Sequence, residues 1–286
     1  MTDIPADLDP EAIQSLLHTQ SLGRDLRVFA EVGSTNDMAL AAGREGAPEG
    51  LAVLADCQSA GRGRLGRTWE SPPGVGIYTS VLLRPRVSAS SASLLTLAAG
   101  IAVAEAIREV TTLQPRLKWP NDLQLAGQKV GGILVEGATL EGQLNEAVVG
   151  IGINVNHDVT DLPAALGNRA TSLRLSLGHS FSRTALVAGL YNTLERWYRV
   201  FHGEERDLIL ERGREWSAVL GQPIEVQSGE QRWGGLAWDL DRDGSLLVRE
   251  GAGTLRRVVA GEVSIRVAGG QVAEPGSFAN DRRNDQ

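Results

Sequence analysis

Two apolar segments in the middle of the chain carry glycines at positions where a β-strand would normally carry packing side chains. Residues 129–136 read K-V-G-G-I-L-V-E, and residues 150–156 read G-I-G-I-N-V-N. Isoleucine and valine favour strands, whereas glycine weakens a strand and often marks a bulge or the close approach of a ligand to the backbone. The sequence therefore predicts two strands in which glycines replace larger side chains, with a flat ligand between the strands.

Length and charge limit the class of protein. With 286 residues, 42% of them hydrophobic, the chain is long enough for one domain of about 200 residues and a smaller appendage. The formal net charge of −7 disfavours nonspecific binding to nucleic acid or to anionic membranes. We expect no membrane span and no signal peptide, and the single cysteine, Cys57, suits a reducing cytoplasm.

Periodicity and turn residues predict a mixed α+β catalytic domain over residues 1–220. Helices are expected at 9–22, 34–44, 89–110, 182–201 and 204–220, and strands at 26–32, 50–57, 75–83, 122–125, 129–136 and 144–155. Ser34 and Asp37 have the spacing of a capping box, and Ala126-Gly127 is expected to turn a hairpin.

The pattern changes near the C-terminus. Short alternating segments at 224–226, 235–238, 246–248 and 263–267 predict a small β-barrel over residues 221–268. The polar tail, residues 269–286, has no periodicity and is expected to be disordered.

A glycine- and arginine-rich loop follows the second predicted strand. Residues 61–66 (G-R-G-R-L-G) match the dinucleotide fingerprint, but the following R-T-W-E-S-P-P-G cannot open a helix, which argues against a Rossmann site. Three guanidiniums, at Arg62, Arg64 and Arg67, on a flexible backbone suit the capture of phosphate or carboxylate. A solvated basic loop is the simpler alternative for this segment taken alone.

A second polar segment, K-W-P-N-D at residues 118–122, places a cation, an indole and two side chains with carbonyl-type oxygens around a proline. Pro-Asn-Asp is typical of a turn. No turn requires the preceding lysine and tryptophan, so a functional site and a plain turn are equally plausible interpretations of this segment.

Five motifs together resemble the catalytic core of the biotin protein ligases. They are G-S-T-N, Q-S-A-G-R-G-R-L-G-R-T-W, K-W-P-N-D, K-V-G-G-I-L-V-E and G-I-G-I-N-V-N, in that order. The resemblance implies an α+β fold in which a mixed β-sheet with flanking helices, similar to class II aminoacyl-tRNA synthetases, is followed by a small C-terminal SH3-like β-barrel. It also implies ATP and biotin as substrates, magnesium with ATP, and transfer of biotin to a lysine of a biotin carboxyl carrier protein domain of a carboxylase.

The resemblance assigns roles to individual residues. It implies catalytic roles for Lys129, Arg64 and Arg62 as one cationic cradle. It implies a biotin site formed by Ser34, Thr35, Asn36, Gln58, Gly61, Arg62, Trp69, Lys129, Gly131, Gly132, Gly150 and Gly152. It implies an ATP site formed by Arg64, Arg67, Lys118, Asn121, Asp122, Asn154 and Arg266. The metal ligands are not identifiable from the sequence.

Two other functions are compatible with parts of this pattern. A lipoate or octanoate ligase shares the fold and the acyl chemistry, although Thr35 and Gln58 favour biotin. A non-catalytic adenylate-binding regulatory module would be expected to lose Lys129 and the arginine loop, which are present. About thirty residues precede Gly33, too few for a winged helix-turn-helix, so we expect a monofunctional enzyme. Which carboxylase serves as acceptor, and whether two copies form a homodimer, are left open.

Overall fold

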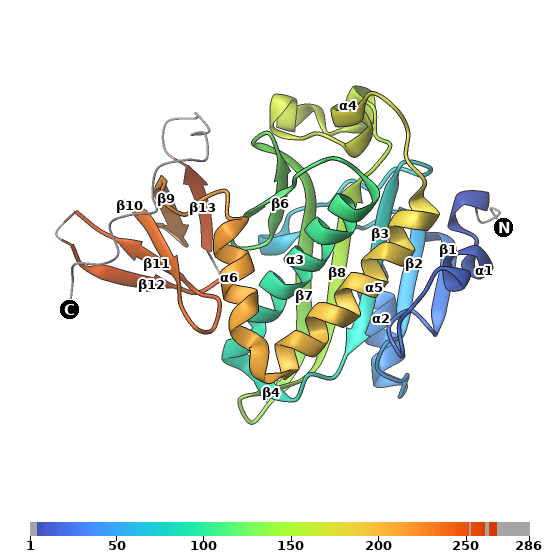
Figure 1. Cartoon of the computed structure of the whole chain (residues 1–286), viewed down its shortest axis with the longest axis horizontal. Coiled ribbons are helices and arrows are strands. Elements are labelled where there is room, and N and C mark those ends of the chain that lie inside the picture. The colour runs from blue at the N-terminus through green and yellow to red at the C-terminus, as the bar shows by residue number, and fades with distance from the viewer. Residues whose placement is uncertain (1–4, 252, 261–262, 268–286) are drawn as a thin grey trace.

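An eight-stranded sheet forms the centre of the molecule in a computed structural model that describes residues 5–251, 253–260 and 263–267 (Figure 1). The strand order is β1-β2-β3-β8-β7-β6-β5, with β4 paired to β8; β1 and β2 are parallel and the other pairs are antiparallel. The strands are β1 (Leu26–Val32), β2 (Ala52–Gln58), β3 (Gly76–Leu83), β4 (Val87–Ser88), β5 (Arg116–Lys118), β6 (Asp122–Leu125), β7 (Gln128–Leu140) and β8 (Gln143–Asn154). The mixed sheet expected from the sequence is confirmed.

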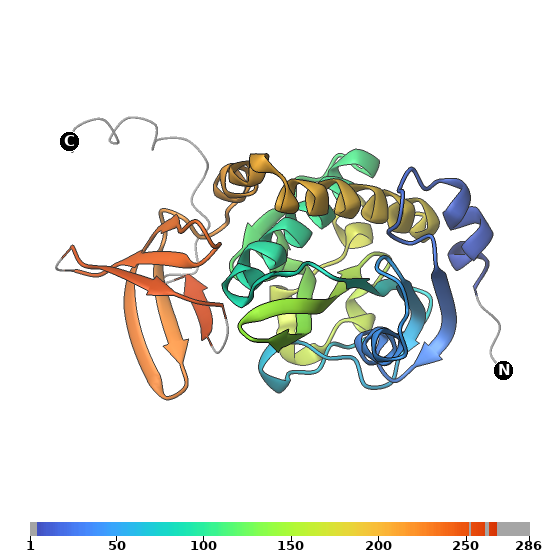
Figure 2. The ribbon, with the colours of Figure 1, turned by 90° about the horizontal axis from the view of Figure 1, so that it is seen from below.

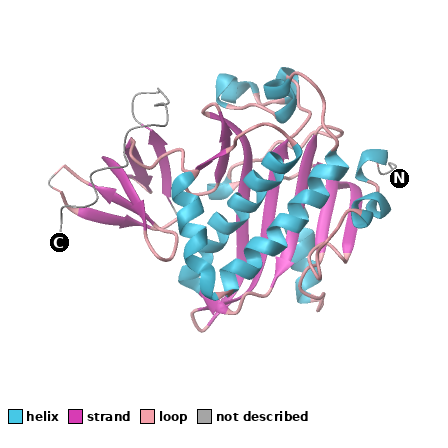
Figure 3. Cartoon of the chain, in the orientation of Figure 1, coloured by secondary structure: helices cyan, strands magenta, loops and turns pink. Residues whose placement is uncertain are grey.

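Helices cover both faces of this sheet. Two long helices, α3 (Ala92–Val110) and α5 (Arg183–His202), lie side by side across one face, and α2 (Thr35–Arg44) covers the other (Figures 2 and 3). The main core fills the space between the sheet and the two long helices, while a smaller apolar cluster lies under α2. The short helices are α1 (Pro10–Ser15), α4 (Leu173–Leu177) and α6 (Asp207–Glu215).

One helix of the domain, α3, is unusually apolar. Residues 89–110 are long and apolar enough to cross a membrane by length and composition alone. Most of this stretch is buried, and α3 packs extensively against α5. Its composition is therefore explained by a position in the core of the domain.

Two predicted helices are shorter than expected because tertiary contacts take over their backbone groups. Helix α1 ends at Ser15 rather than near residue 22. The N–H groups of Gln20, Ser21 and Leu22 instead donate to the Glu195 carboxylate of α5, at 2.7, 2.8 and 3.2 Å. A segment whose amides are held by a distant carboxylate does not continue a helix.

The helix predicted over residues 204–220 shows the same effect. Helix α6 ends at Glu215. Beyond it, Leu117 N–H of β5 donates to the carbonyl of Trp216, and Ala218 N–H donates to the carbonyl of Leu117, each at 2.8 Å. The chain leaves the helix because it pairs with the edge strand.

The C-terminal strands form a separate five-stranded antiparallel sheet in the order β12-β11-β10-β9-β13. Its strands are β9 (Pro223–Ser228), β10 (Gln231–Leu240), β11 (Leu246–Arg249), β12 (Leu255–Val258) and β13 (Val263–Val267). The expected small β-domain is confirmed, although β12 was missed because its four residues lack alternation. The tail expected to be disordered lies outside the described residues.

A buried arginine ties three separate parts of the catalytic domain together. The Arg183 side chain, only 1% exposed, pairs at 2.6 Å with Asp7 near the N-terminus and with Asp56 of β2. It also donates to the carbonyl of Gly76 on β3 at 3.2 Å. The hydrogen bond from Arg183 lowers the pKa of Asp7. Because Gln58 follows Asp56 by two residues, this pair also fixes the strand end that leads into the arginine loop.

We expect Arg183→Met to lower the free energy of unfolding by about 3–5 kcal/mol, because it leaves Asp56 buried without its counter-charge. Arg27→Met is the matched control: Arg27 forms an exposed pair with Asp25, for which a loss of about 0–1 kcal/mol is expected. Denaturant unfolding of both variants measures the two values, and equal losses would contradict the structural role given to Arg183.

A buried histidine makes the stability of the domain depend on pH. His157, three residues beyond the end of β8, is 1% exposed, and its Nε2 lies 3.2 Å from the Tyr78 hydroxyl. Burial lowers the pKa of His157 from 6.5 to about 4. The ring is therefore neutral in the folded protein at pH values where the unfolded chain binds a proton.

We expect this histidine to destabilise the fold progressively as the pH falls from 6.5 to about 4, by about 3 kcal/mol in total. Above pH 6.5 both states are neutral at this position and the contribution vanishes. His157→Gln removes the titration, so its stability should fall less steeply over this range than that of the unmodified chain. Unfolding free energies measured from pH 7 to pH 4 provide the comparison, and parallel curves would refute the prediction.

Candidate functional site

One cavity of about 390 Å³ gathers most of the residues expected to form the site. It extends from the N-terminus of α2, past the arginine loop, to the hairpin of β6 and β7 and the segment 163–170. The expected residues that line it are Ser34, Thr35, Asn36, Gln58, Arg62, Arg64, Arg67, Trp69, Lys118, Asn121, Asp122, Lys129, Gly132, Gly150, Gly152 and Asn154. Gly61, Gly131 and Arg266 are not among the lining residues.

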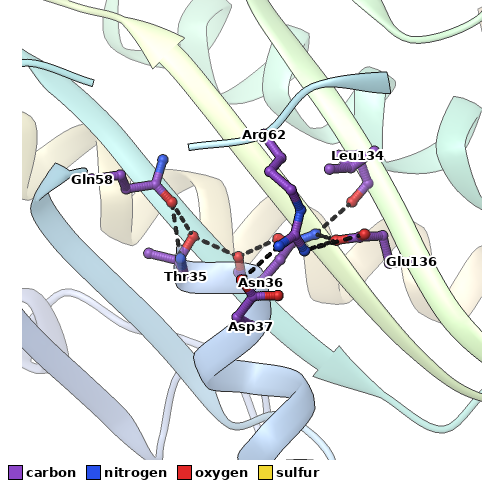
Figure 4. Close-up of polar contacts among 8 residues, drawn as sticks. Thr35, Asn36, Asp37, Gln58, Arg62, Leu134 and Glu136 are labelled. Atoms are coloured by element: carbon purple, nitrogen blue, oxygen red, sulfur yellow. Dashed lines mark hydrogen bonds and ion pairs between the residues drawn. The ribbon is translucent and has the colours of Figure 1, made fainter. Parts of the chain in front are cut away.

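At one end of the cavity, uncharged polar groups at the start of α2 form a continuous network (Figure 4). The backbone N–H of Thr35 donates to Gln58 Oε1 at 2.9 Å, and the Thr35 hydroxyl lies 3.1 Å from the same oxygen. Ser80 of β3 connects Thr35 and Asn36, with its hydroxyl 2.7 Å from Thr35 Oγ1 and 2.5 Å from Asn36 Oδ1. Every residue named here except Gln58 is less than 5% exposed, so this end holds oriented donors and acceptors away from water.

The expected capping box at this helix is not formed. Ser34 precedes α2, but its side chain makes no capping hydrogen bond. The side chain of Gln58 instead satisfies the free amide of Thr35, and Asp37 pairs with Arg62. The ends of β2 and α2 are thereby held together at the cavity.

Arg62 belongs to this polar end and not to the cation cluster. Its guanidinium donates to Asp37 Oδ2 at 2.5 Å and to Glu136 Oε2 at 2.9 Å (Figure 4). The hydrogen bond with Asp37 raises the pKa of Arg62. Glu136 lies seven residues beyond Lys129 on β7, a separation of roughly 23 Å along a strand. The single cradle expected from Arg62, Arg64 and Lys129 is therefore divided, because two carboxylates hold Arg62 elsewhere.

The opposite end of the cavity collects positive charge around one carboxylate. Lys129 Nζ lies 2.6 Å from Asp122 Oδ1 and 5.1 Å from the centre of the Trp69 ring. Burial lowers the pKa of Lys118, and the nearby cations Lys129, Arg266 and Arg67 lower it further, against the opposing effect of Asp122. The excess of cations over carboxylates makes this end suited to an anion with several charges.

Arg64 joins the arginine loop to both domains. Its guanidinium donates to Asn121 Oδ1 at 3.1 Å and to the carbonyl of Ala260 beyond β12. Burial lowers the pKa of Arg64. Arg266 lies on β13 with an exposed side chain, and its charge acts on Lys118 although it does not line the cavity.

Gly132, Gly150 and Gly152 line the cavity and also make room for protein side chains. A Cβ at Gly152 would stand 2.5 Å from the Trp69 indole, and one at Gly150 would stand 2.1 Å from Asn36 Oδ1. Gly132 pairs with Gly152 and lies under the same indole, whereas Gly131 faces Leu123. The expected flat group between the strands is thus partly the Trp69 ring itself, whose buried Nε1 has no hydrogen-bond partner.

The arginine loop is a small hairpin. Trp69 N–H donates to the carbonyl of Gly61 at 2.9 Å, and Gly63 N–H donates to that of Arg67 at 2.7 Å. A Cβ at Gly61 would stand 2.5 Å from the Trp69 carbonyl, so this glycine closes the loop instead of lining the cavity. The loop is followed by β3, whereas in a Rossmann site it would be followed by a helix, so the structure agrees with the exclusion of such a site.

The K-W-P-N-D segment both joins the two domains and lines the cavity. Trp119 donates from its indole to the carbonyl of Gly244 at 3.0 Å, which joins the catalytic domain to the C-terminal sheet. Asn121 is fixed to β7 by Ile133, whose N–H and carbonyl make hydrogen bonds of 2.9 Å to its backbone and side chain. This anchoring places Asp122 beside Lys129. The predicted hairpin that follows is confirmed, with positive φ angles of 48° at Ala126 and 81° at Gly127.

Sequence reasoning missed two groups of residues at the site. Ser80 and Glu136 complete the polar network, and the polar pair Thr79-Ser80 within the mostly apolar β3 was a signal that could have been used. Pro163, Leu166 and Arg169 also line the cavity. They belong to a segment without periodicity, which reaches the site because Thr171 N–H donates to the carbonyl of Lys129. Asn154 is held to the same segment by a 3.0 Å hydrogen bond to the Thr171 carbonyl.

Within residues 5–251, 253–260 and 263–267, no group of three or more histidine, cysteine, aspartate or glutamate residues could hold a metal ion. The acidic turn between β10 and β11 is a hairpin, and its Asp241 and Asp243 pair with Arg257.

Comparisons with known proteins agree with this geometry. Residues 28–154 match the model of the biotin/lipoate A/B protein ligase family, and residues 219–266 match that of the biotin protein ligase C-terminal domain. The chain is 34% identical to the biotin--[acetyl-CoA-carboxylase] ligase of Mycobacterium tuberculosis, over 90% of this chain and 95% of that protein. It is 32% identical to the bifunctional ligase/repressor BirA of Bacillus subtilis, over 91% of this chain and 80% of that protein. The biotin protein ligase from Aquifex aeolicus in complex with biotin and ATP superposes with a TM-score of 0.74 at 30% identity, covering 86% of this chain and 100% of that one.

We expect Gly150→Ala to lower the free energy of unfolding by about 1–3 kcal/mol, because the added Cβ meets the buried Asn36 amide at 2.1 Å. Gly251→Ala is the control, since a Cβ there meets nothing within 4 Å. Denaturant unfolding provides the measurement. A Gly150 variant as stable as the control would show that Asn36 is not held against β8.

Proposed function

Because the chain belongs to the biotin protein ligase family, we propose that it uses ATP to activate the carboxylate of biotin and then transfers the biotinyl group to a lysine of a carrier protein. The observation that carries the proposal is a single cavity with oriented uncharged groups at one end and clustered cations at the other. The neutral ring of biotin fits the first end and the triphosphate of ATP fits the second. The two reacting groups meet between them.

The first step joins two anions. The biotin carboxylate attacks the α-phosphate of ATP, which gives biotinyl-AMP and releases pyrophosphate. Like charges about 4 Å apart repel by about 4 kcal/mol at an effective dielectric constant near 20. Lys129 is proposed to offset this repulsion, since it lines the cavity at its cationic end and is held in place by Asp122.

The second step transfers the acyl group. The lysine amine of the acceptor attacks the acyl carbon of the mixed anhydride, an amide bond forms and AMP leaves. No enzyme nucleophile is needed, because the anhydride is already reactive. Arg64 and Arg67 of the arginine loop are proposed to hold the phosphate group, and magnesium is expected to enter with ATP as part of the substrate.

A lipoate or octanoate ligase is the alternative within the same superfamily. Its substrates have no ring N–H groups or ring carbonyl. The hydrogen-bonded network of Thr35, Asn36, Gln58 and Ser80 would then face an apolar group. Its oriented polar groups would find no hydrogen-bond partner in the ligand, which is unfavourable. This network therefore favours biotin.

The proposed partner is the biotin carboxyl carrier protein domain of a carboxylase, in keeping with the relatives named as biotin--[acetyl-CoA-carboxylase] ligases. The net charge of −7 argues against nucleic acid or an anionic membrane as a partner, and the single cysteine is compatible with the cytoplasm. A homodimer formed through an edge of the large sheet would have to use β1, because residues 216–218 already pair with β5 at the other edge. Native mass measurement decides between monomer and dimer.

The function is tested by incubating the protein with ATP, magnesium, a carrier domain and either biotin or lipoate, followed by intact-mass analysis. We expect the carrier to gain one biotinyl group and no lipoyl group. The chain contains only two lysines, Lys118 and Lys129, so acylation of the ligase itself is readily distinguished from acylation of the carrier. Lipoylation without biotinylation would overturn the proposal in favour of the alternative.

Lys129→Met tests the role of the central cation. We expect pyrophosphate release with ATP and biotin to slow by about 100-fold or more, because a positioned charge is lost where negative charges meet. Biotin binding without ATP should remain measurable by calorimetry. Arg242→Met, in an exposed turn of the C-terminal sheet, is the control and should be unchanged. An unchanged rate of pyrophosphate release in the Lys129 variant would refute its role.

A further inference from the structure

We propose that Glu136 is a positioning residue for the ring-binding end of the cavity, acting through Asn36 without lining the cavity itself. Its carboxylate, on β7, accepts from Asn36 Nδ2 at 2.6 Å and from the Arg62 guanidinium at 2.9 Å (Figure 4). Asn36 and Arg62 both line the cavity, whereas Glu136 does not. The inference rests on the proposed function and concerns how the same site recognises the ring of biotin.

Glu136 determines which way the Asn36 amide points. A carboxylate accepts hydrogen bonds and donates none, so the NH₂ group of Asn36 must face it and the amide oxygen must face away. The carbonyl of Leu134, 3.4 Å from the same nitrogen, supports this orientation. The absence of a side chain at Gly150 leaves the space that the amide oxygen occupies. Asn36 is 4% exposed, so water does not compete for these contacts.

The orientation of Asn36 fixes the protons of the neighbouring hydroxyls. The Ser80 hydroxyl has one proton, and Asn36 Oδ1, at 2.5 Å, can only accept it. Thr35 then keeps its own proton within the protein, directed to Ser80 Oγ at 2.7 Å or to Gln58 Oε1 at 3.1 Å. In both cases the Thr35 oxygen meets the cavity with lone pairs only.

The result is a surface at the buried end of the cavity that accepts hydrogen bonds. Such a surface binds a ring N–H group, as in a cyclic urea, and leaves an alkyl or disulfide ring without a matching group. If the Asn36 amide were reversed, Ser80 would have to donate to Thr35 and one of these lone pairs would be lost. The negative charge of Glu136, which does not line the cavity itself, thus determines that the groups facing the cavity accept hydrogen bonds.

Glu136→Gln is the test, because a glutamine side chain can either donate or accept and no longer dictates the Asn36 orientation. We expect the dissociation constant for biotin, measured by calorimetry without ATP, to rise about 10-fold. With saturating biotin, kcat for pyrophosphate release and KM for ATP should stay within about 2-fold of the unmodified enzyme. This separation between the two substrates would not result from a general loss of stability.

Two control variants isolate the effect. Glu146→Gln removes the charge from another glutamate. Glu146 lies on β8, pairs with Arg84 and does not line the cavity, so this substitution should leave biotin binding unchanged. Asp37→Asn weakens the other ion pair of Arg62 without touching Asn36, and should change biotin binding by less than about 2-fold.

The outcomes separate this inference from the proposed function. If the unmodified enzyme binds biotin and releases pyrophosphate, an unchanged dissociation constant in Glu136→Gln overturns the inference alone. An equal effect of Asp37→Asn also overturns it, because anchoring of Arg62 would then account for the result. An unmodified chain that neither binds biotin nor releases pyrophosphate overturns the proposed function, and the inference with it.

Discussion

The antiparallel register between β7 and β8 is the constraint on which the site depends. It places Gly132 opposite Gly152 and Leu134 opposite Gly150, so that the glycines face the cavity. Trp69 and Asn36 fill the space that these glycines leave. A shift of one residue would turn the glycines into the core and the bulky isoleucines toward the cavity, because side chains alternate along a strand. The apolar alternation of both strands therefore fixes the shape of the cavity and the stability of the core together.

The second organising feature is the separation of charge along the cavity. Near α2, Arg62 lines the cavity but its charge is balanced by Asp37 and Glu136, and the other polar groups there are neutral and oriented. Near the β6–β7 hairpin, Lys118 and Lys129 share Asp122. A substrate with a neutral ring and a carboxylate tail, adjacent to a polyphosphate, matches this distribution. A basic loop without this separation would attract anions but would not orient them.

Much of the fold could be predicted from the sequence because its local signals are strong. Strand β1 was predicted at its observed bounds, and the turn at Ala126-Gly127 and the long helices were predicted within a few residues. The errors occur where distant groups compete for the backbone. Glu195 takes the amides of residues 20–22, Trp216 pairs with β5, and Gln58 replaces Ser34 as the cap of α2. No periodicity within a segment reports such partners.

By itself, the sequence determined most of the strands, the glycine pattern and the identity of about half of the residues that line the cavity, since these depend on neighbours within a few positions and on motifs in a fixed order. Only the tertiary structure decided what each of those residues contacts. Arg62 is paired because Asp37, 25 positions before it, and Glu136, 74 positions after it, meet at its guanidinium. Gly150 accommodates Asn36, and Gly152 accommodates Trp69, for the same reason. Charge pairing and packing depend on distance in space, which the order of residues along the chain does not specify.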